Sequence, residues 1–181
     1  MTIVIVYETH SLSVDNERGI GTGWLDGELS ERGRELAREL GGRRRDDGIV
    51  AVYTSDLGRA VETAELAFGG SGTPIHTDWR LRECNYGELN GQPISRFEGE
   101  PPRRMDMPYP GGGESYRQVV ERVRSFLDDL PAELDGARIV VVGHAATRWA
   151  LEHLLDGTPL EELVGAPFQW QEGWEYVLRR S

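Results

Sequence analysis

Residues 2–10 read TIVIVYETH, a run of mostly β-branched and aromatic side chains that ends in a polar pair. An apolar run without the alternation of a half-buried strand is typical of a strand covered on both faces of a parallel sheet. Residues 138–144 read RIVVVGH, so a second apolar run also ends next to a histidine. The two runs therefore predict buried strands that place His10 and His144 at carboxyl ends.

The rest of the chain alternates between short strands and amphipathic helices. We expect further strands at 49–53 and 75–77. Helices are expected after three capping serines, Ser30, Ser55 and Ser115, over residues 31–40, 56–67 and 116–130, and again over 145–155. This alternation predicts an α/β fold, a three-layer sandwich whose mostly parallel central sheet is flanked by helices. With 181 residues, we expect one domain over 1–181.

The more irregular segments carry their own predictions. Residues 8–28 are predicted to be loop, and Gly41 with Gly42 to end the first helix. Residues 78–113 hold most of the prolines and are predicted to form an excursion that covers a site. A closing hairpin is expected at 168–170 and 174–178, with Trp170 and Trp174 as core or strand-pairing residues. Residues 43–45, all arginine, are interpreted as helix-end charges that need no partner.

Composition excludes several classes of function. The formal net charge is -11, which argues against a nucleic-acid partner. All 20 Lys+Arg residues are arginines, which excludes P-loop, Schiff-base and kinase-type lysine chemistry. The lone cysteine, Cys84, excludes an intrachain disulfide and a cysteine-based zinc site. Because no apolar run approaches the roughly 18 residues of a membrane span, we expect a cytoplasmic protein without a membrane partner.

Ligands of open parallel sheets bind at the carboxyl ends of the strands. Three predicted strand ends carry polar groups: His10 follows the first, Arg59 lies just beyond the second, and His144 follows the last. One histidine alone is more often satisfied by hydrogen bonds within a turn. Two imidazoles and a guanidinium at neighbouring strand ends instead favour a compact positive pocket for a phosphate dianion.

Five motifs in order resemble the signature of the histidine phosphatase superfamily, which is phosphoglycerate-mutase-like. They are His10 with Asn16, Thr22-Gly23-Trp24 and Leu29-Ser30-Glu31-Arg32-Gly33; Ser55 to Arg59-Ala60 with Thr63-Ala64; Leu81 to Gly87 with Asn90-Gly91; Gly113-Glu114-Ser115; and Val142-Gly143-His144-Ala145. The resemblance covers nearly the whole chain. Each motif is weak alone, but their shared order and spacing make the combination specific.

The resemblance implies a role for each site residue. His10 attacks phosphorus and becomes a phosphohistidine, and Glu83 protonates the leaving alcohol before activating water. His144 and Arg59 hold the phosphoryl oxygens. The resemblance also implies phosphate- or substrate-binding positions at Thr9, Asn16, Thr22, Gly23 and Ala145. Phosphoryl transfer is mostly positioning and charge stabilisation, so this scheme needs no metal ion and no cofactor.

One motif departs from the family pattern. Where the family has Arg-His-Gly, this chain has Thr9-His10-Ser11, so the first arginine is replaced by threonine. The candidates to supply the missing positive charge are Arg18, Arg82 and Arg148. A weaker enzyme, or one tuned to an unusual ester, is the other consequence of this replacement.

The resemblance thus predicts a metal-independent phosphomonoester hydrolase that acts on a small phosphorylated metabolite through a phosphohistidine. A mutase is less expected, because mutases of the family tend to be longer. The alternative is a catalytically weak or inactive relative that binds phosphorylated ligands or acts as a non-enzymatic partner. The sequence leaves the alcohol part of the substrate open, and it is compatible with a homodimer.

Overall fold

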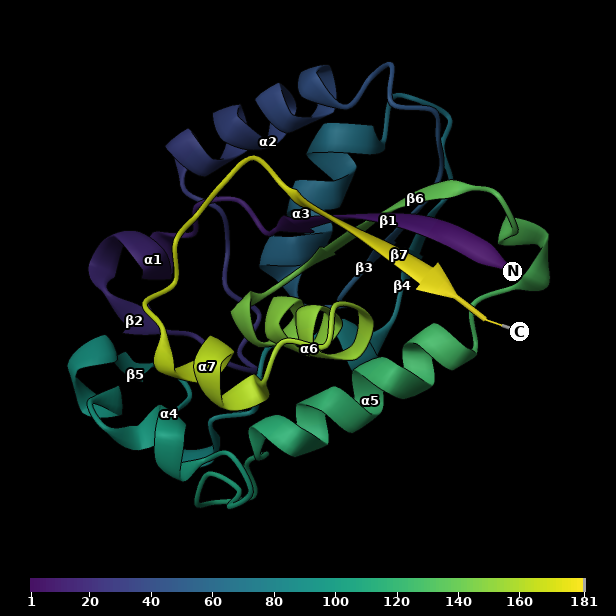
Figure 1. The fold of residues 1–181 in the computed structure, drawn as a ribbon. Helices are drawn as coiled ribbons and strands as arrows, with labels where there is room; N and C mark the ends of the chain where they lie inside the picture. Colours follow the sequence, from purple (N-terminus) through teal and green to yellow (C-terminus); the bar gives the residue numbers. More distant parts are fainter. Residues whose placement is uncertain (181) are drawn as a thin grey trace.

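The computed structural model describes residues 1–180 and contains a five-stranded central sheet in the order β4-β3-β6-β1-β7 (Figure 1). The strands are β1 (Thr2–Thr9), β3 (Ile49–Thr54), β4 (Ile75–Thr77), β6 (Arg138–Gly143) and β7 (Trp174–Arg179). The first four run parallel, and β7 pairs antiparallel with β1 at the edge of the sheet. The predicted mostly parallel sheet is confirmed, and β1 and β6 are its buried central strands.

Four long helices cover the two faces of the sheet (Figure 1). These helices are α2 (Glu31–Arg43), α3 (Gly58–Phe68), α5 (Tyr116–Asp128) and α6 (Ala145–Leu155). The strand side chains alternate between two cores: Ile5 and Val141 pack with α5 and α6, whereas Val6 and Val140 pack with α2 and α3. This alternation is why both apolar runs are continuous, and it confirms the three-layer sandwich.

The remaining elements are short, and all but the 3-10 helix at Ala132–Leu134, which leads into β6, lie around the carboxyl ends of the strands. They are α1 (Val14–Arg18), β2 (Ile20–Gly21), β5 (Gln92–Pro93), α4 (Glu100–Arg103), α7 (Leu160–Gly165) and 3-10 helices at Trp79–Leu81, Gly87–Leu89, Ile94–Phe97 and Ala132–Leu134. β2 and β5 form a separate two-stranded sheet. This ladder ties the excursion of residues 78–113 to the segment after β1, so both border the same region.

Several predicted boundaries need correction. Residues 8–28 are not all loop, because they contain the end of β1, α1 and β2. Helix α2 continues past Gly41 to Arg43. A Cβ atom at Gly41 would overlap the backbone carbonyl of Ala67 in the neighbouring α3. That glycine allows two helices to pack closely and does not end one. The segment 168–170 forms no strand, and β7 pairs with β1 in place of the expected hairpin.

The helices are shorter or more polar than a membrane-spanning helix needs to be. Among residues 1–180, no helix is both long enough and apolar enough to cross a membrane.

Candidate active site

Three neighbouring strands end side by side at the site. In the parallel pair of β1 and β6, Thr9 lies opposite Gly143, and the His10 amide extends this ladder by donating to the Gly143 carbonyl at 2.8 Å. Strand β3 pairs with the other side of β6 and ends next to Ser55. The strand ends therefore bring His10, Ser55 and His144 to one edge of the sheet, as the sequence predicted.

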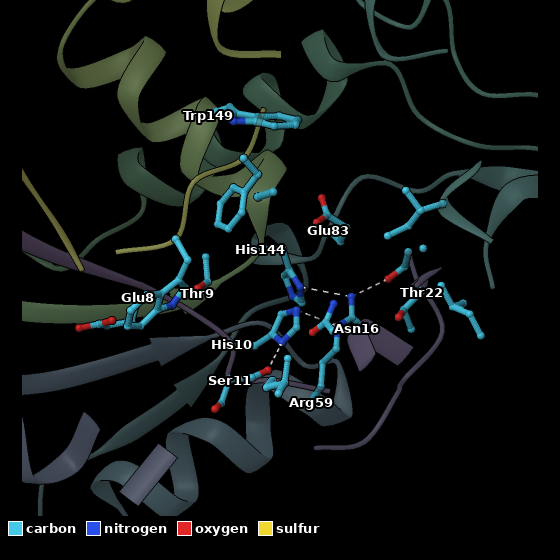
Figure 2. Close-up of a pocket in the computed structure, with 18 of the residues that line it drawn as sticks. Glu8, Thr9, His10, Ser11, Asn16, Thr22, Arg59, Glu83, His144 and Trp149 are labelled. Atoms are coloured by element: carbon cyan, nitrogen blue, oxygen red, sulfur yellow. Dashed lines mark hydrogen bonds between the residues drawn. The ribbon is translucent and has the colours of Figure 1, made fainter. Parts of the chain in front are cut away.

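The buried guanidinium of Arg59, in the first turn of α3, contacts both histidines. Its Nε lies 3.3 Å from His10 Nε2, and one Nη atom lies 3.2 Å from His144 Nδ1. Its other donors bond the backbone carbonyls of Gly23, Leu25 and Asp26, at 2.9, 2.7 and 3.1 Å. A guanidinium has five N–H groups, so every donor of Arg59 is used. Three of them fix its orientation and the other two point at the imidazoles (Figure 2).

The His10 ring is held in one tautomer by the backbone. Its Nδ1 lies 2.7 Å from the carbonyl oxygen of Ser11, which can only accept a hydrogen bond, so Nδ1 carries the proton. The lone pair of Nε2 is therefore the one directed at Arg59. Desolvation, reinforced by the positive charge of Arg59, lowers the pKa of His10 to about 3. His10 is thus a neutral imidazole whose Nε2 has the properties of a nucleophile.

His144 is the residue immediately before α6, and it is almost completely buried. Because Arg59 can only donate to Nδ1, the proton of the neutral ring is on Nε2, which lies 2.7 Å from Ser55 Oγ. The hydroxyl group of Tyr7 donates to the His144 carbonyl at 2.6 Å and fixes the backbone. Desolvation, followed by the charge of Arg59, keeps the pKa of His144 well below its usual value.

The contact between Ser55 and His144 corrects the predicted role of this serine. Helix α3 begins at Gly58 after Leu57, and its first turn has no side-chain cap. The chain continues for three residues between β3 and α3, so the Ser55 hydroxyl is too early to cap the helix. It instead orients the imidazole of a neighbouring strand.

Glu83 is 8% exposed and lies in the excursion between the first two 3-10 helices. Its Oε1 accepts hydrogen bonds from the amides of Cys84 and Ala146, at 2.8 and 3.2 Å. Burial raises the pKa of Glu83, although these amides and a nearby arginine oppose the shift. The carboxyl group lines the same cavity as His10 and His144 (Figure 2). A buried carboxyl group with a raised pKa is suited to donate a proton.

The backbone of Glu83 is held by two side chains. Trp24 Nε1 and an Nη of Arg122 both donate to the Glu83 carbonyl at 2.8 Å. Arg122 is itself buried and forms a bidentate pair with Glu114, at 2.8 and 3.1 Å. Glu114 also accepts from the Asn85 amide at 2.9 Å. The motif containing Glu114 therefore acts on the site by supporting the segment that carries Glu83.

Sequence reasoning did not identify Arg122 as a site residue. Its signal is its position: it lies on α5 between Val119 and Val123, which are both buried. A charge among the core positions of an amphipathic helix is rarely left unpaired, so Arg122 could have been recognised as a buried ion-pair partner.

Asn16 presents a hydrogen-bond donor to the site because its acceptor is already used. Its Oδ1 accepts from the Ser13 amide at 3.0 Å in the capping box of α1. The Nδ2 group is then left facing the region of His10 and Arg59 (Figure 2). The neighbouring Thr22 also lines the cavity, and its hydroxyl group donates to the Asp15 carboxylate at 2.8 Å.

The other predicted binding residues also line the cavity. Thr9 ends β1, and Ala145 is the first residue of α6, where the helix dipole favours an anion. Gly23 has a φ of 56°, and a Cβ atom there would overlap the side chain of Asn90. Glycine at this position therefore allows the backbone to turn tightly and offer its carbonyl to Arg59.

The structure does not bring Arg18, Arg82 or Arg148 into the cavity. Arg18 is exposed in the last turn of α1. Arg82 forms a bidentate pair with Asp56 at 2.7 Å, and Arg148 pairs with Glu152 on its own helix. Arg82 and Arg148 are held by partners outside the cavity, and the replacement of the missing arginine by one of the three stays a prediction.

The site opens into a cavity of about 680 Å³. It is lined by Glu8, Thr9, His10, Ser11, Leu12, Asn16, Ile20, Gly21, Thr22, Gly23, Leu36, Glu39, Leu40, Arg43, Arg59, Glu83, Tyr86, Ile94, Phe97, Pro101, Tyr116, His144, Ala145, Trp149, Phe168, Trp170 and Glu172. Two of them correct earlier predictions. Trp170 is 61% exposed and is neither a core nor a strand-pairing residue. Arg43 does have a partner, since its guanidinium lies 3.6 Å from the buried carboxylate of Glu8.

Within residues 1–180, no group of three or more histidine, cysteine, aspartate and glutamate side chains is close enough together to hold a metal ion.

Comparison with known proteins identifies a family. Residues 8–170 match the family model described as "Histidine phosphatase superfamily (branch 1)". One relative, a 2,3-bisphosphoglycerate-dependent phosphoglycerate mutase of Parvibaculum lavamentivorans, is 32% identical over 94% of this chain and 91% of its own.

Two solved structures extend the likeness to three dimensions. YhfR of Bacillus stearothermophilus has a TM-score of 0.83 and 27% identity, covering 99% of this chain and 92% of that chain. A mycobacterial glucosyl-3-phosphoglycerate phosphatase, in a structure with VO3, has a TM-score of 0.75 and 27% identity, covering 92% and 85%. The relatives thus include proteins named as mutases and proteins named as phosphatases.

Proposed function

Since the chain belongs to the histidine phosphatase superfamily, we propose that it hydrolyses phosphate monoesters through a phosphohistidine at His10, without a metal ion or other cofactor. The observation that carries the proposal is the contact of one fixed guanidinium, that of Arg59, with His10 Nε2 and His144 Nδ1. Two neutral imidazoles and one cation at a single point can receive a phosphoryl group and react with it.

In the first step, the lone pair of His10 Nε2 forms a bond to phosphorus while the bond between phosphorus and the alcohol oxygen breaks. The proton on Nδ1 stays in its hydrogen bond to the Ser11 carbonyl, which stabilises the positive charge that the ring acquires. The leaving oxygen takes the proton of Glu83, whose raised pKa makes it an effective donor. The products of this step are the free alcohol and phosphorylated His10.

In the second step, the Glu83 carboxylate takes a proton from water, and the water oxygen attacks phosphorus. The bond between phosphorus and Nε2 breaks, so phosphate leaves and His10 returns to its neutral form. Glu83 is protonated again at the end of the cycle. In both steps, the two N–H groups of Arg59 that contacted the histidines donate to the phosphoryl oxygens. The Asn16 Nδ2 group and the Ala145 amide add neutral donors.

The test is to trap the phosphoenzyme. The protein is mixed with a labelled aryl phosphate in the presence of EDTA and quenched in alkali, in which phosphohistidine survives. We expect label on the wild-type chain and steady turnover, with both lost in His10→Ala. His76→Ala serves as a matched control, since it removes an exposed imidazole outside the cavity. Turnover that requires added metal, or that persists in His10→Ala, would contradict the proposal.

Products separate hydrolysis from mutase activity, which the names of several relatives make a specific alternative. Both reactions share a phosphorylated His10, but they differ in the acceptor. With phosphoglycerate as substrate, a hydrolase releases inorganic phosphate, whereas a mutase releases an isomer and conserves the ester. We expect phosphate release. Isomer formation without free phosphate would replace hydrolase by mutase and leave the role of His10 unchanged.

A further inference from the structure

The cavity above His10 has an ordered aromatic wall. Edge-to-face or tilted contacts join Phe97 to Tyr86, Tyr86 to Tyr109, Tyr109 to Tyr116, and Tyr116 to Trp149, with ring centroids between 4.8 and 6.3 Å apart. Four of these rings line the cavity, and Tyr109 lies behind them as a buried support. Because the rings pack on one another, they offer a preformed apolar surface to a ligand.

The mouth of the cavity is apolar as well. Ile94, Phe168 and Trp170 line it, although they are 57, 43 and 61% exposed. Large hydrophobic side chains gathered around an opening are typical of a binding site, because single exposed apolar residues are usually scattered. An apolar ligand that entered here would be covered by both the wall and the mouth.

The charges of the cavity do not favour a second anionic group on the ligand. Its cations are Arg59, whose N–H groups all have partners, and Arg43, which lies 3.6 Å from the buried Glu8 carboxylate, although Arg44 outside the cavity is nearer to that carboxylate at 2.7 Å. Glu39 and Glu172 also line the cavity and add negative charge. A carboxylate or second phosphate would therefore lose its water of hydration in a cavity whose lining residues include four glutamates and two arginines.

We infer that the protein hydrolyses phosphate monoesters whose alcohol is bulky, apolar and uncharged, and that it discriminates against esters with a second anionic group. The inference rests on the proposed function and adds the substrate class. It joins two independent features of the same cavity, the aromatic wall with its apolar mouth and the excess of glutamates over arginines among the lining residues. Figure 2 shows Trp149 on the open side of the two histidines, where the alcohol would extend.

The experiment compares esters of matched reactivity. Hexyl phosphate, ω-aminohexyl phosphate and ω-carboxypentyl phosphate have similar leaving groups, because the terminal charge is far from the ester. We expect kcat/KM to be highest for hexyl phosphate and at least about tenfold lower for the carboxylate, since an unpaired charge is costly to bury. In the series from methyl to hexyl phosphate, each added methylene should raise kcat/KM roughly fourfold until the cavity is filled.

Variants locate the effect in the cavity. Trp170→Ala should reduce the chain-length dependence, and Met107→Ala, which removes another exposed hydrophobic side chain outside the cavity, should leave it as in the wild type. A carboxylate or ammonium ester preferred to hexyl phosphate would overturn the inference but leave the phosphatase intact. No hydrolysis of any ester and no phosphorylated His10 would overturn the proposed function itself, and the substrate class with it.

Discussion

Arg59 Nε lies 3.3 Å from His10 Nε2, and this contact relates the resting site to the reacting one. The same guanidinium reaches His144 Nδ1 at 3.2 Å, while its remaining N–H groups are fixed on backbone carbonyls. Without a ligand, Arg59 keeps both imidazoles neutral and unprotonated on the sides that face it. A bound phosphoryl group could replace only these two contacts, so Arg59 would change partners without changing position.

Arg59→Lys should reduce kcat/KM for an alkyl phosphate by about 100- to 1000-fold. Lysine preserves the charge, but its three donors cannot satisfy three carbonyls and two phosphoryl oxygens in the planar arrangement of a guanidinium. Initial rates and the unfolding temperature, both measured for each protein, separate a loss of catalysis from a loss of stability. Arg124→Lys is the matched control, because Arg124 is exposed on α5 and does not line the cavity. A loss of only a few fold in Arg59→Lys would show that charge alone suffices.

Glu83→Gln should reduce hydrolysis of an alkyl phosphate between about 100- and 10,000-fold, but affect para-nitrophenyl phosphate much less. Glutamine keeps the shape of the side chain and cannot donate a carboxyl proton. An alkoxide needs that proton to leave, whereas nitrophenolate leaves without it. Equal losses for the two esters would indicate that Glu83 is structural. The measurement is the ratio of the two kcat/KM values in each protein.

The same variant should change the pH dependence. Burial raises the pKa of Glu83, and only the protonated form donates, so kcat/KM for the alkyl ester should fall as pH rises through that pKa. On the acid side, protonation of the His10 imidazole should lower kcat/KM only near about pH 3. In Glu83→Gln the alkaline fall assigned to Glu83 should be absent. Its persistence would assign the alkaline group to another residue.

Ser55→Ala should lower kcat/KM by up to about tenfold, the range of one hydrogen bond. Ser55 Oγ lies 2.7 Å from His144 Nε2 and fixes the ring so that Nδ1 faces Arg59. Nitrogen NMR of labelled His144 should show a shifted or broadened Nε2 resonance in the variant, because its hydrogen bond to Ser55 is lost, while Nδ1 stays unprotonated beside Arg59. A rate loss with an unchanged His144 spectrum would mean that Ser55 acts by another route. Ser71→Ala, on the surface turn after α3, is the control.

The sequence predicted the central frame of the site because that frame follows from strand ends. Two buried apolar runs must lie in the middle of a sheet, and their carboxyl ends must then be neighbours, which brings His10 and His144 together. Arg59 follows because β3 pairs with the other side of β6. Such relationships depend on periodicity and chain direction, which a single sequence contains.

The parts that were mispredicted depend on distance in space. Ser55 stands at a position typical of a helix cap, yet its hydroxyl group forms a hydrogen bond with the imidazole of His144, which lies 89 positions further along the chain. Arg82 precedes Glu83 in the chain, yet a bidentate pair with Asp56 turns it out of the cavity. Trp170 is a large aromatic residue of the kind that usually packs in a core, yet it lines the mouth of a cavity. Local propensity does not determine which of several partners a polar or aromatic side chain reaches.

The depressed pKa of His10 should also appear in the folding equilibrium. In the unfolded chain a histidine has a pKa of about 6.5, and in the folded protein the pKa of His10 is about 3. Between these values only the unfolded state takes up the proton, so this stabilisation is complete above the unfolded pKa and is lost as pH falls. By about pH 5 the loss amounts to about 2 kcal/mol in the free energy of unfolding.

Urea denaturation at about pH 8 and about pH 5 should show a smaller loss of stability on acidification in His10→Gln than in the wild type. His76→Gln, an exposed position, should behave as the wild type does. Glu83 and His144 are present in all three proteins, so their own contributions cancel in the comparison. An equal acid loss in His10→Gln and the wild type would contradict the assignment of a neutral, desolvated imidazole to His10.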